Sequence, residues 1–432
     1  MENKEIITEK EKYLNERCQE LLSYGFISNK EDFNLKCLDD IDVVGFDIDF
    51  TLSIYNKYNL TKLCYESFMK YLVEEKNYPK CLLSYEQNKK IFDKFAGQFV
   101  LLDAKRGNNL KINSKKEIIV GYHGTKQLTE EEIKKQYNNN IFDNYTFGTR
   151  YVKDEFYISF DSFELHIPAM YVLCVDFFDR KILPKSVKNY EMILNDILGG
   201  FGYNFGLKKE FSQCKKSGYY YPEIWKKPKK YLSNYKPIEI LKLFKSKGKK
   251  LFLATNSVSS YADYILKNTI GSDYQNYFDL CFFKAMKPFF FQNPKDCKCL
   301  NNKKEKVDCI NGMDDHVFKE VQEGENIFYG GHYNIIEKYY EKLLGKKDIK
   351  YCFIGDNIIG DCKVPGEIKD WRGIFIFDGF GDIKNKLCED IEREGEAYEI
   401  KEKSQKLDLI SEYYKDYCIM ALPDIDGLKY FI

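Results

Sequence analysis

Two aspartates, Asp47 and Asp49, close an apolar run near the start of the chain, Val43-Val44-Gly45-Phe46. In an extended chain, residues two positions apart point to the same side, so both carboxyl groups would leave the end of a strand together. Like charges this close repel each other and raise one pKa unless a cation or a division of roles separates them. The pair therefore predicts catalytic or metal-binding chemistry. The alternative is an acidic turn after an edge strand.

Two further apolar runs end in residues suited to phosphate. The run at 251–254 leads into Thr255-Asn256-Ser257. A hydroxyl and an amide before a helix N-terminus can hold phosphate oxygens, although Ser and Asn are also ordinary helix caps. The run ending in Phe282-Phe283 is followed by Lys287-Pro288. This lysine could supply positive charge to a phosphoryl group, or it could be a solvated loop residue.

The last of these runs, at 350–354, again ends in acids. It leads through Gly355 into Asp356, and Asp361 follows five residues later. Gly355 permits a tight turn at this point. Four aspartates at one sheet edge would require a cation. Mg²⁺ takes oxygen ligands and binds through one or two carboxylates plus substrate phosphate, so it is the expected cofactor.

Taken in order, the four stretches predict phosphoryl transfer. Asp47 can act as a nucleophile that forms an aspartyl-phosphate. Asp49 can protonate the leaving oxygen and later activate water. The charge on the phosphoryl oxygens would then be stabilised by Mg²⁺, Thr255, Asn256 and Lys287.

The hydrophobic pattern places these residues on a split parallel sheet. Strands are expected at 42–47, 250–254, 279–283, 350–354 and 373–377, with helices at 259–268 and 332–345 between them. Roughly 200 residues separate the first two strands, whereas about 30 suffice for a simple βαβ unit. The predicted fold class is therefore α/β, a Rossmann-like parallel sheet core with a large inserted, mainly helical cap domain. The core would comprise 1–55 with 240–432 and the cap 56–239, and the sequence leaves open whether part of the insertion belongs to the core.

Other segments have weaker patterns. In the first half of the chain we predict a charged amphipathic helix at 1–38 with a break near 28–30, a helix at 59–73, and strand-like runs at 98–103 and 117–121 around a turn at 106–109. A short segment at 154–160 precedes a predicted buried helix at 167–178. Beyond it we predict helical structure at 185–247, a long loop from 284 to 326 and a charged helix at 384–421.

The amino-acid composition limits the kinds of partner that the protein is expected to bind. Lys plus Arg and Asp plus Glu number 67 each, which indicates neither a nucleic-acid nor a membrane partner. No run of about 18 apolar residues appears, and the N-terminus lacks an apolar signal region. The 14 cysteines lie mostly in apolar runs, which favours reduced thiols and a cytoplasmic location. Cys297, Cys299, Cys309 and His316 match no usual zinc spacing, so we predict a surface loop there, with a zinc site as the alternative.

At these residues the chain resembles a known group of enzymes. The four core motifs resemble those of the haloacid dehalogenase-like phosphohydrolases. Within that superfamily, the stretches from Gly45 to Tyr55 and from Gly355 to Asp361 look like the cytosolic purine 5′-nucleotidases, which prefer IMP and GMP. In the insertion, His123-Gly124-Thr125-Lys126 and Tyr221-Pro222-Glu223-Ile224 look more like the 5′-nucleotidase domain-containing proteins. The resemblance runs from about residue 40 to 380.

The resemblance implies a HAD-type fold and a Mg²⁺-dependent 5′-nucleotidase, with phosphotransfer to a nucleoside as a further activity. Mg²⁺ would be held by Asp47, the backbone carbonyl of Asp49, and Asp356, with Asp361 in support. The cap would read the base, and the segment 195–205 is where we expect its residues, while His123 is either a substrate contact or a turn residue. A homo-oligomer, dimer or tetramer, is expected. The alternatives are a phosphatase of another small phosphomonoester and a non-catalytic scaffold.

Overall fold

The computed structural model describes residues 8–23, 27, 38–113, 117–137, 151–152, 155–159, 162–205, 218–293, 298–308, 315–377 and 414–431. The chain divides into two compact units. We call them the core unit, formed by Met1–Ile54, Asn234–Gly381 and Ile410–Ile432, and the insertion unit, formed by Tyr55–Ser233 and Asp382–Leu409.

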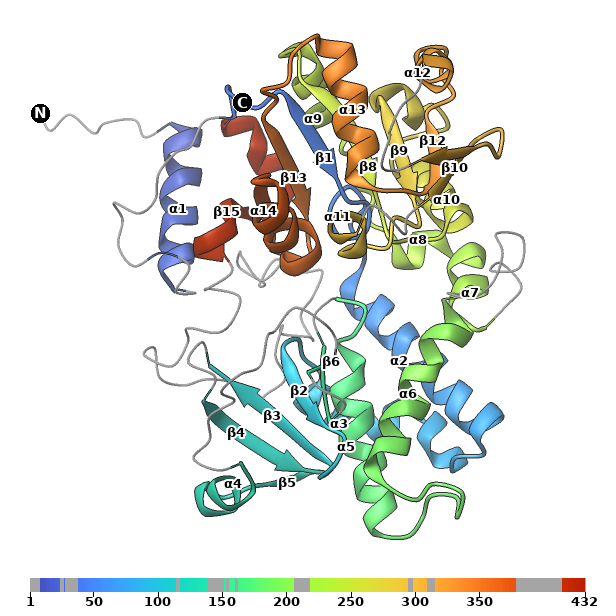
Figure 1. The fold of residues 1–432 in the computed structure, drawn as a ribbon. Coiled ribbons are helices and arrows are strands. Elements are labelled where there is room, and N and C mark those ends of the chain that lie inside the picture. Colours follow the sequence, from blue (N-terminus) through green and yellow to red (C-terminus); the bar gives the residue numbers. More distant parts are fainter. Residues whose placement is uncertain are drawn as a thin grey trace, which may run out of the picture. The chain divides into compact units, whose positions relative to one another are not determined.

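The core unit contains a nine-stranded sheet in the order β11-β10-β12-β9-β8-β1-β13-β14-β15 (Figure 1). Every neighbouring pair from β12 to β15 is parallel, and only β10 pairs antiparallel, with β11 and β12. This is the predicted α/β class with a Rossmann-like core. The strands are β1 (Val43–Phe46), β8 (Lys250–Ala254), β9 (Leu280–Phe283), β10 (Lys298–Asn301), β11 (Lys306–Asp308), β12 (Ile327–Gly330), β13 (Tyr351–Gly355), β14 (Arg372–Ile376) and β15 (Cys418–Leu422).

β1 lies inside the sheet, between β8 and β13, and all four of its residues are buried. A Cβ atom on Gly45 would lie 2.2 Å from the Phe252 ring, so the absence of a side chain lets β8 pack closely. Along the chain, strands are added on one side of β1 from β8 to β12 and on the other from β13 to β15. The strand order thus reverses at β1 and β13, and ligands of such sheets bind at the carboxyl ends there.

The five predicted core strands and both predicted helices are present. The helices are α10 (Ser259–Thr269) and α13 (Tyr333–Leu344), and α9 (Ile238–Ser246) and α14 (Val364–Lys369) add to them. α1 (Glu9–Ser23) occupies part of the predicted N-terminal helix.

Two predictions for the core unit were wrong. Most of the predicted C-terminal helix lies outside the described residues, but its end forms strand β15, since the apolar run Cys418–Leu422 pairs in parallel with β14. The predicted long loop contains β10, β11 and α12 (Asp315–Gln322), and β12 follows directly after it. Cys299 is fully buried on β10, so it does not belong to a surface loop; Cys297 and Cys309 lie outside the described residues.

The insertion unit combines helices with a six-stranded antiparallel sheet, ordered β5-β4-β3-β2-β7-β6. Its strands are β2 (Val100–Asp103), β3 (Asn108–Ile112), β4 (Ile118–His123), β5 (Lys126–Gln127), β6 (Tyr151–Val152) and β7 (Phe156–Ile158). Its main helices are α2 (Lys57–Lys76), α3 (Tyr85–Phe95), α5 (His166–Asp179), α6 (Tyr190–Asn204) and α7 (Tyr220–Lys226). The predicted buried helix at 167–178 is confirmed as α5, whereas β3 was missed between the two predicted strands.

The two ends of the segment Tyr55–Ser233, the main part of the insertion unit, are held together. Tyr55 and Leu232 form an antiparallel bridge, and the backbone N–H of Asn56 donates to the carbonyl of Tyr231 at 2.8 Å. The segment Tyr55–Ser233 of this unit therefore begins and ends at one place. Among the described helices, none is long and apolar enough to cross a lipid bilayer.

Candidate active site

The predicted site residues follow four adjacent strands of the core unit. Asp47 follows β1, and its backbone N–H donates to the Ile354 carbonyl of β13 at 2.9 Å. Thr255 follows β8, and its N–H donates to the Phe282 carbonyl of β9 at 2.9 Å. Because parallel strands end at one edge of a sheet, these backbone contacts bring the four stretches together as expected.

Lys287 joins two of the aspartates. Its Nζ lies 2.6 Å from Asp361 Oδ1 and 3.1 Å from Asp47 Oδ1, and the lysine side chain is only 3% exposed. Burial alone would lower the pKa of Lys287, but Asp361 and Asp47 together raise it well above its ordinary value. The ammonium group is therefore a fixed positive charge inside the site, and Lys287 is not a solvated loop residue.

Asp361 is fully buried on a π-helical turn, Ile358–Lys363. Burial raises the pKa of this carboxyl group to about 6, with Asp47 acting in the same direction and Lys287 against it. Its Oδ2 accepts the backbone N–H of Asn357 at 3.1 Å. A Cβ atom on Gly355 would lie 2.1 Å from Oδ2 of Asp361, so this position requires glycine.

The loop that carries Lys287 is tied to the loop after β8. The amide group of Asn256 accepts the Lys287 N–H at 2.5 Å and donates to the Lys287 carbonyl at 2.9 Å. The N–H of Ala285 donates to the Thr255 carbonyl at 2.8 Å. Asn256 thus fixes the backbone of the lysine, and Thr255 lies buried beside it. Met286 has a φ of +61°, a left-handed conformation that is strained for a bulky residue.

Asp49 has a hydrogen-bond partner, Ser257, for which no role was predicted. The hydroxyl group of Ser257 donates to Oδ2 of Asp49 at 2.5 Å. Asp49 is buried, and its backbone forms a bridge with Ser53. The sequence does contain this second hydroxyl group, in Thr255-Asn256-Ser257, but only the fold shows that it contacts Asp49.

The carboxylates of the core unit can hold a metal ion. Asp47, Asp356 and Asp361 offer oxygens that all lie within 4.8 Å of one another. Three carboxylates against the single ammonium of Lys287 leave two negative charges, 3 − 1 = 2. Hard oxygen ligands with this excess charge fit a divalent cation such as Mg²⁺.

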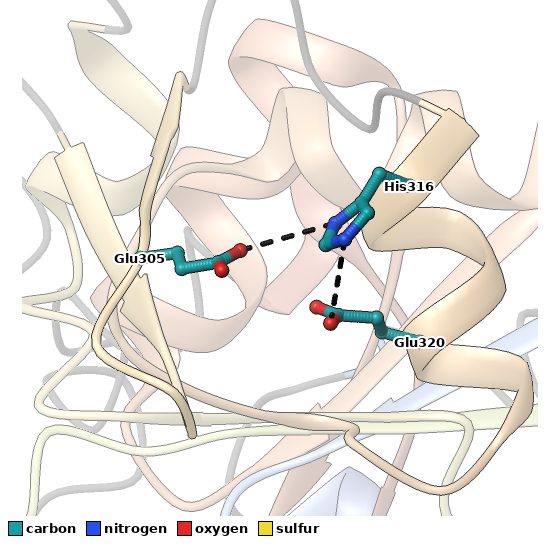
Figure 2. A group of neighbouring side chains, drawn as sticks. All are labelled: Glu305, His316 and Glu320. Atoms are coloured by element: carbon teal, nitrogen blue, oxygen red, sulfur yellow. Dashed lines mark ion pairs between the residues drawn. The ribbon is translucent and has the colours of Figure 1, made fainter.

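A second group of this kind involves His316, which lies between Glu305 and Glu320 (Figure 2). Its Nδ1 is 3.9 Å from Glu305 and its Nε2 is 3.7 Å from Glu320. Lys303 already pairs with the buried carboxylate of Glu320. Because the two ring nitrogens face different glutamates and a lysine supplies the countercharge, the group is an ion-pair network. Cys299 is not part of it.

His123 in the insertion unit is engaged at both ring nitrogens. Nδ1 lies 2.8 Å from Asn108 Oδ1, and Nε2 lies 2.9 Å from Asp179 Oδ2. Asp179 also accepts the hydroxyl of Tyr190 at 2.8 Å. Gly124 follows, and a Cβ there would lie 1.9 Å from Asp176 Oδ1. These contacts favour the turn interpretation of His123.

The segment 195–205, where we expected residues that read the base, forms the second half of α6. Cβ atoms on Gly199 and Gly200 would lie 2.6 Å from the Tyr71 hydroxyl and from the Phe68 ring. These glycines therefore let α6 pack on α2. The residues that would read a base stay a prediction.

The four motifs lie together at the carboxyl edge of a parallel sheet, and sequence comparison identifies the family of the chain. A model of the 5' nucleotidase family matches residues 33–419, so the chain belongs to that family and to the phosphomonoester hydrolases. Among curated proteins it is similar to 5'-nucleotidase domain-containing protein 1 of Bos taurus, with 26% identity over 82% of this chain and 75% of the relative. The protein of the same name from Homo sapiens is 26% identical over 78% of this chain and 71% of its own length.

Proposed function

We propose that this protein is a Mg²⁺-dependent 5′-nucleotidase of the haloacid dehalogenase type that hydrolyses purine nucleoside 5′-monophosphates such as IMP and GMP. The observation that carries the proposal is the buried Lys287 between Asp47 and Asp361. A fixed ammonium beside a carboxylate at the carboxyl edge of a parallel sheet suits a dianionic phosphoryl group.

The two acids after β1 would take different roles. Asp47 attacks phosphorus, the bond from phosphorus to the ester oxygen breaks, and that oxygen takes a proton from Asp49. Asp49 then removes a proton from water as the water oxygen attacks the aspartyl-phosphate. The bond from phosphorus to Asp47 breaks, inorganic phosphate leaves, and both acids return to their starting states.

The remaining residues would bind and orient the phosphoryl group. Lys287 supplies positive charge to its oxygens, and Thr255 and Asn256 lie on the adjoining loop. Asp47, Asp356 and the backbone carbonyl of Asp49 would hold Mg²⁺, with Asp361 in support. When bound, Mg²⁺ would neutralise charge on the phosphoryl oxygens and between the carboxylates.

Family membership supports a nucleotide substrate, and the purine preference rests on the likeness of the core motifs to purine 5′-nucleotidases. A phosphatase of another small phosphomonoester is the second candidate. Its support is that Gly199 and Gly200, in the segment where base-reading residues were expected, serve the packing of α6 on α2. Homo-oligomer formation, a cytoplasmic location and the absence of a nucleic-acid partner are further predictions, of which sedimentation would test the first.

The test is phosphate release from IMP, GMP, AMP, CMP and a sugar phosphate with Mg²⁺. We expect turnover that Asp47→Asn abolishes, and a preference for IMP and GMP of more than tenfold, about 1.4 kcal/mol of transition-state binding. No turnover of any substrate, or an active Asp47→Asn protein, would rule the proposal out and favour the scaffold alternative. Equal rates on sugar phosphates would favour the second candidate.

A further inference from the structure

The hydroxyl group of Ser257 distinguishes the two acids that follow β1. Its Oγ lies 2.5 Å from Oδ2 of Asp49, a distance typical of a charge-assisted hydrogen bond to a carboxylate. Asp47, two residues earlier, instead faces Nζ of Lys287 at 3.1 Å. The first acid thus lies beside a fixed positive charge, and the second lies beside a neutral hydroxyl group.

This difference suits a group that must change state during the reaction. A lysine ammonium can only donate hydrogen bonds, whereas a serine hydroxyl can donate or accept. The hydroxyl can donate to Asp49 as a carboxylate and accept from it as a carboxylic acid. The contact between Ser257 and Asp49 therefore survives in both states.

Ser257 is itself held rigidly. Its backbone N–H donates to Thr255 Oγ1 at 3.1 Å, and its carbonyl accepts the N–H of Lys284 at 3.0 Å. The backbone of Ser257 is thus held on both sides, which limits where its hydroxyl group and the carboxyl group of Asp49 can lie.

We propose that Ser257 is a positioning residue: its hydroxyl holds the carboxyl group of Asp49 in the orientation for proton exchange, first with the leaving oxygen and then with the attacking water. The proposal rests on the proposed function, in which Asp49 moves the proton.

Two substrates separate this role from a structural one. The alkoxide that leaves a nucleoside monophosphate needs a proton, whereas p-nitrophenolate leaves p-nitrophenyl phosphate without one. Because kcat/KM reports steps up to the first irreversible one, it isolates transfer to Asp47. We expect Ser257→Ala to lower kcat/KM for the nucleotide on the order of tenfold, part of the 10²–10⁴-fold of general acid catalysis. The value for p-nitrophenyl phosphate should change much less.

Variants of matched shape provide the controls. Ser257→Thr keeps a hydroxyl group and should restore the nucleotide reaction. Ser257→Val has the same shape as the threonine variant but lacks the hydroxyl group. The comparison of the threonine and valine variants tests the role of the hydroxyl group even if the alanine variant is unstable. Ser260→Ala removes a buried hydroxyl that makes no hydrogen bond, three residues along, and should leave both reactions unchanged.

The outcomes separate the two proposals. An active wild-type enzyme whose Ser257→Ala variant loses nothing, or loses the same factor on both substrates, overturns the role of Ser257 alone. Wild-type protein inactive on both substrates, or unaffected by Asp47→Asn, overturns the proposed function and this inference with it.

Discussion

Gly355 and Asp361 fit so closely that a methyl group on Gly355 would lie 2.1 Å from Oδ2 of the Asp361 carboxylate. The glycine ends β13, and the aspartate lies on the turn that follows. We expect Gly355→Ala to displace Asp361, and with it Lys287, so that phosphate release falls at least tenfold, a loss of about 1.4 kcal/mol. Gly248→Ala is the control for a glycine change, since a Cβ there meets nothing within 4 Å, although its φ of +76° adds some strain. Full activity of Gly355→Ala would contradict the prediction.

Removing the ammonium group of Lys287 should also lower the free energy of unfolding of the core unit. Lys287→Met leaves the carboxylate of Asp361 buried without its partner, which typically costs about 3–5 kcal/mol. The double variant Lys287→Met/Asp361→Asn should regain much of that stability but stay inactive. Urea unfolding measures both, and a double variant no more stable than the single one would argue against a buried ion pair.

The stability of the insertion unit should depend on pH through His166. This residue is fully buried, and burial lowers the pKa of its imidazole to about 3, whereas an unfolded histidine titrates near about 6.5. Between these values the unfolded chain binds more protons than the folded chain, so stability falls as pH falls from 6.5 towards 3. Thermal unfolding of wild type and His166→Leu at pH 7 and pH 5 should show a weaker pH dependence in the variant. Parallel curves for the two proteins would show that other groups are responsible.

Mg²⁺ should stabilise the folded chain by mass action. At a free concentration one hundred times its Kd, a ligand that binds only the folded state adds about 2.7 kcal/mol. We therefore expect metal-stripped protein to melt at a lower temperature, and Mg²⁺ to restore it. Asp356→Asn should abolish this shift, and Asp348→Asn, a change at an exposed acid, should retain it. An unchanged shift in Asp356→Asn would remove this residue from the ligand set.

The core unit was predictable because its strands are continuous apolar runs. A strand buried on both faces needs no alternation, so β1, β8, β9, β13 and β14 stand out from their surroundings. The order of the runs then placed Asp47, Thr255, Lys287 and Asp356 at one edge. The hydroxyl partner of Asp49 could not be found in this way, since a hydrogen bond between residues 208 positions apart depends on the fold.

Strand β3 was missed because it is polar, and its side chains find partners inside the protein. On β3, Lys111 is fully buried and donates to the Gln98 carbonyl at 3.4 Å, and Asn109 donates to the Pro168 carbonyl at 3.0 Å. Their residue types indicate a loop, and only the surrounding structure makes them acceptable in a sheet. On β10, Asn301 is likewise buried and donates to the carboxylates of Glu305 and Glu320, in a Lys- and Asn-rich stretch.

The bridge between Tyr55 and Leu232 has consequences for how the chain folds and for how it can be engineered. β1 must find β8 across the whole insertion, and closing an unfolded loop costs about 0.6 kcal/mol more for each doubling of its length. An insertion that folds first, with Tyr55 and Leu232 already joined, shortens that loop to the 8 residues before Tyr55 and the 17 residues after Leu232. Synthesis of the insertion before β8 gives it time to do so. By the same reasoning, we expect that a short linker between Tyr55 and Leu232 could replace residues 56–231 and leave the nine-stranded sheet able to form.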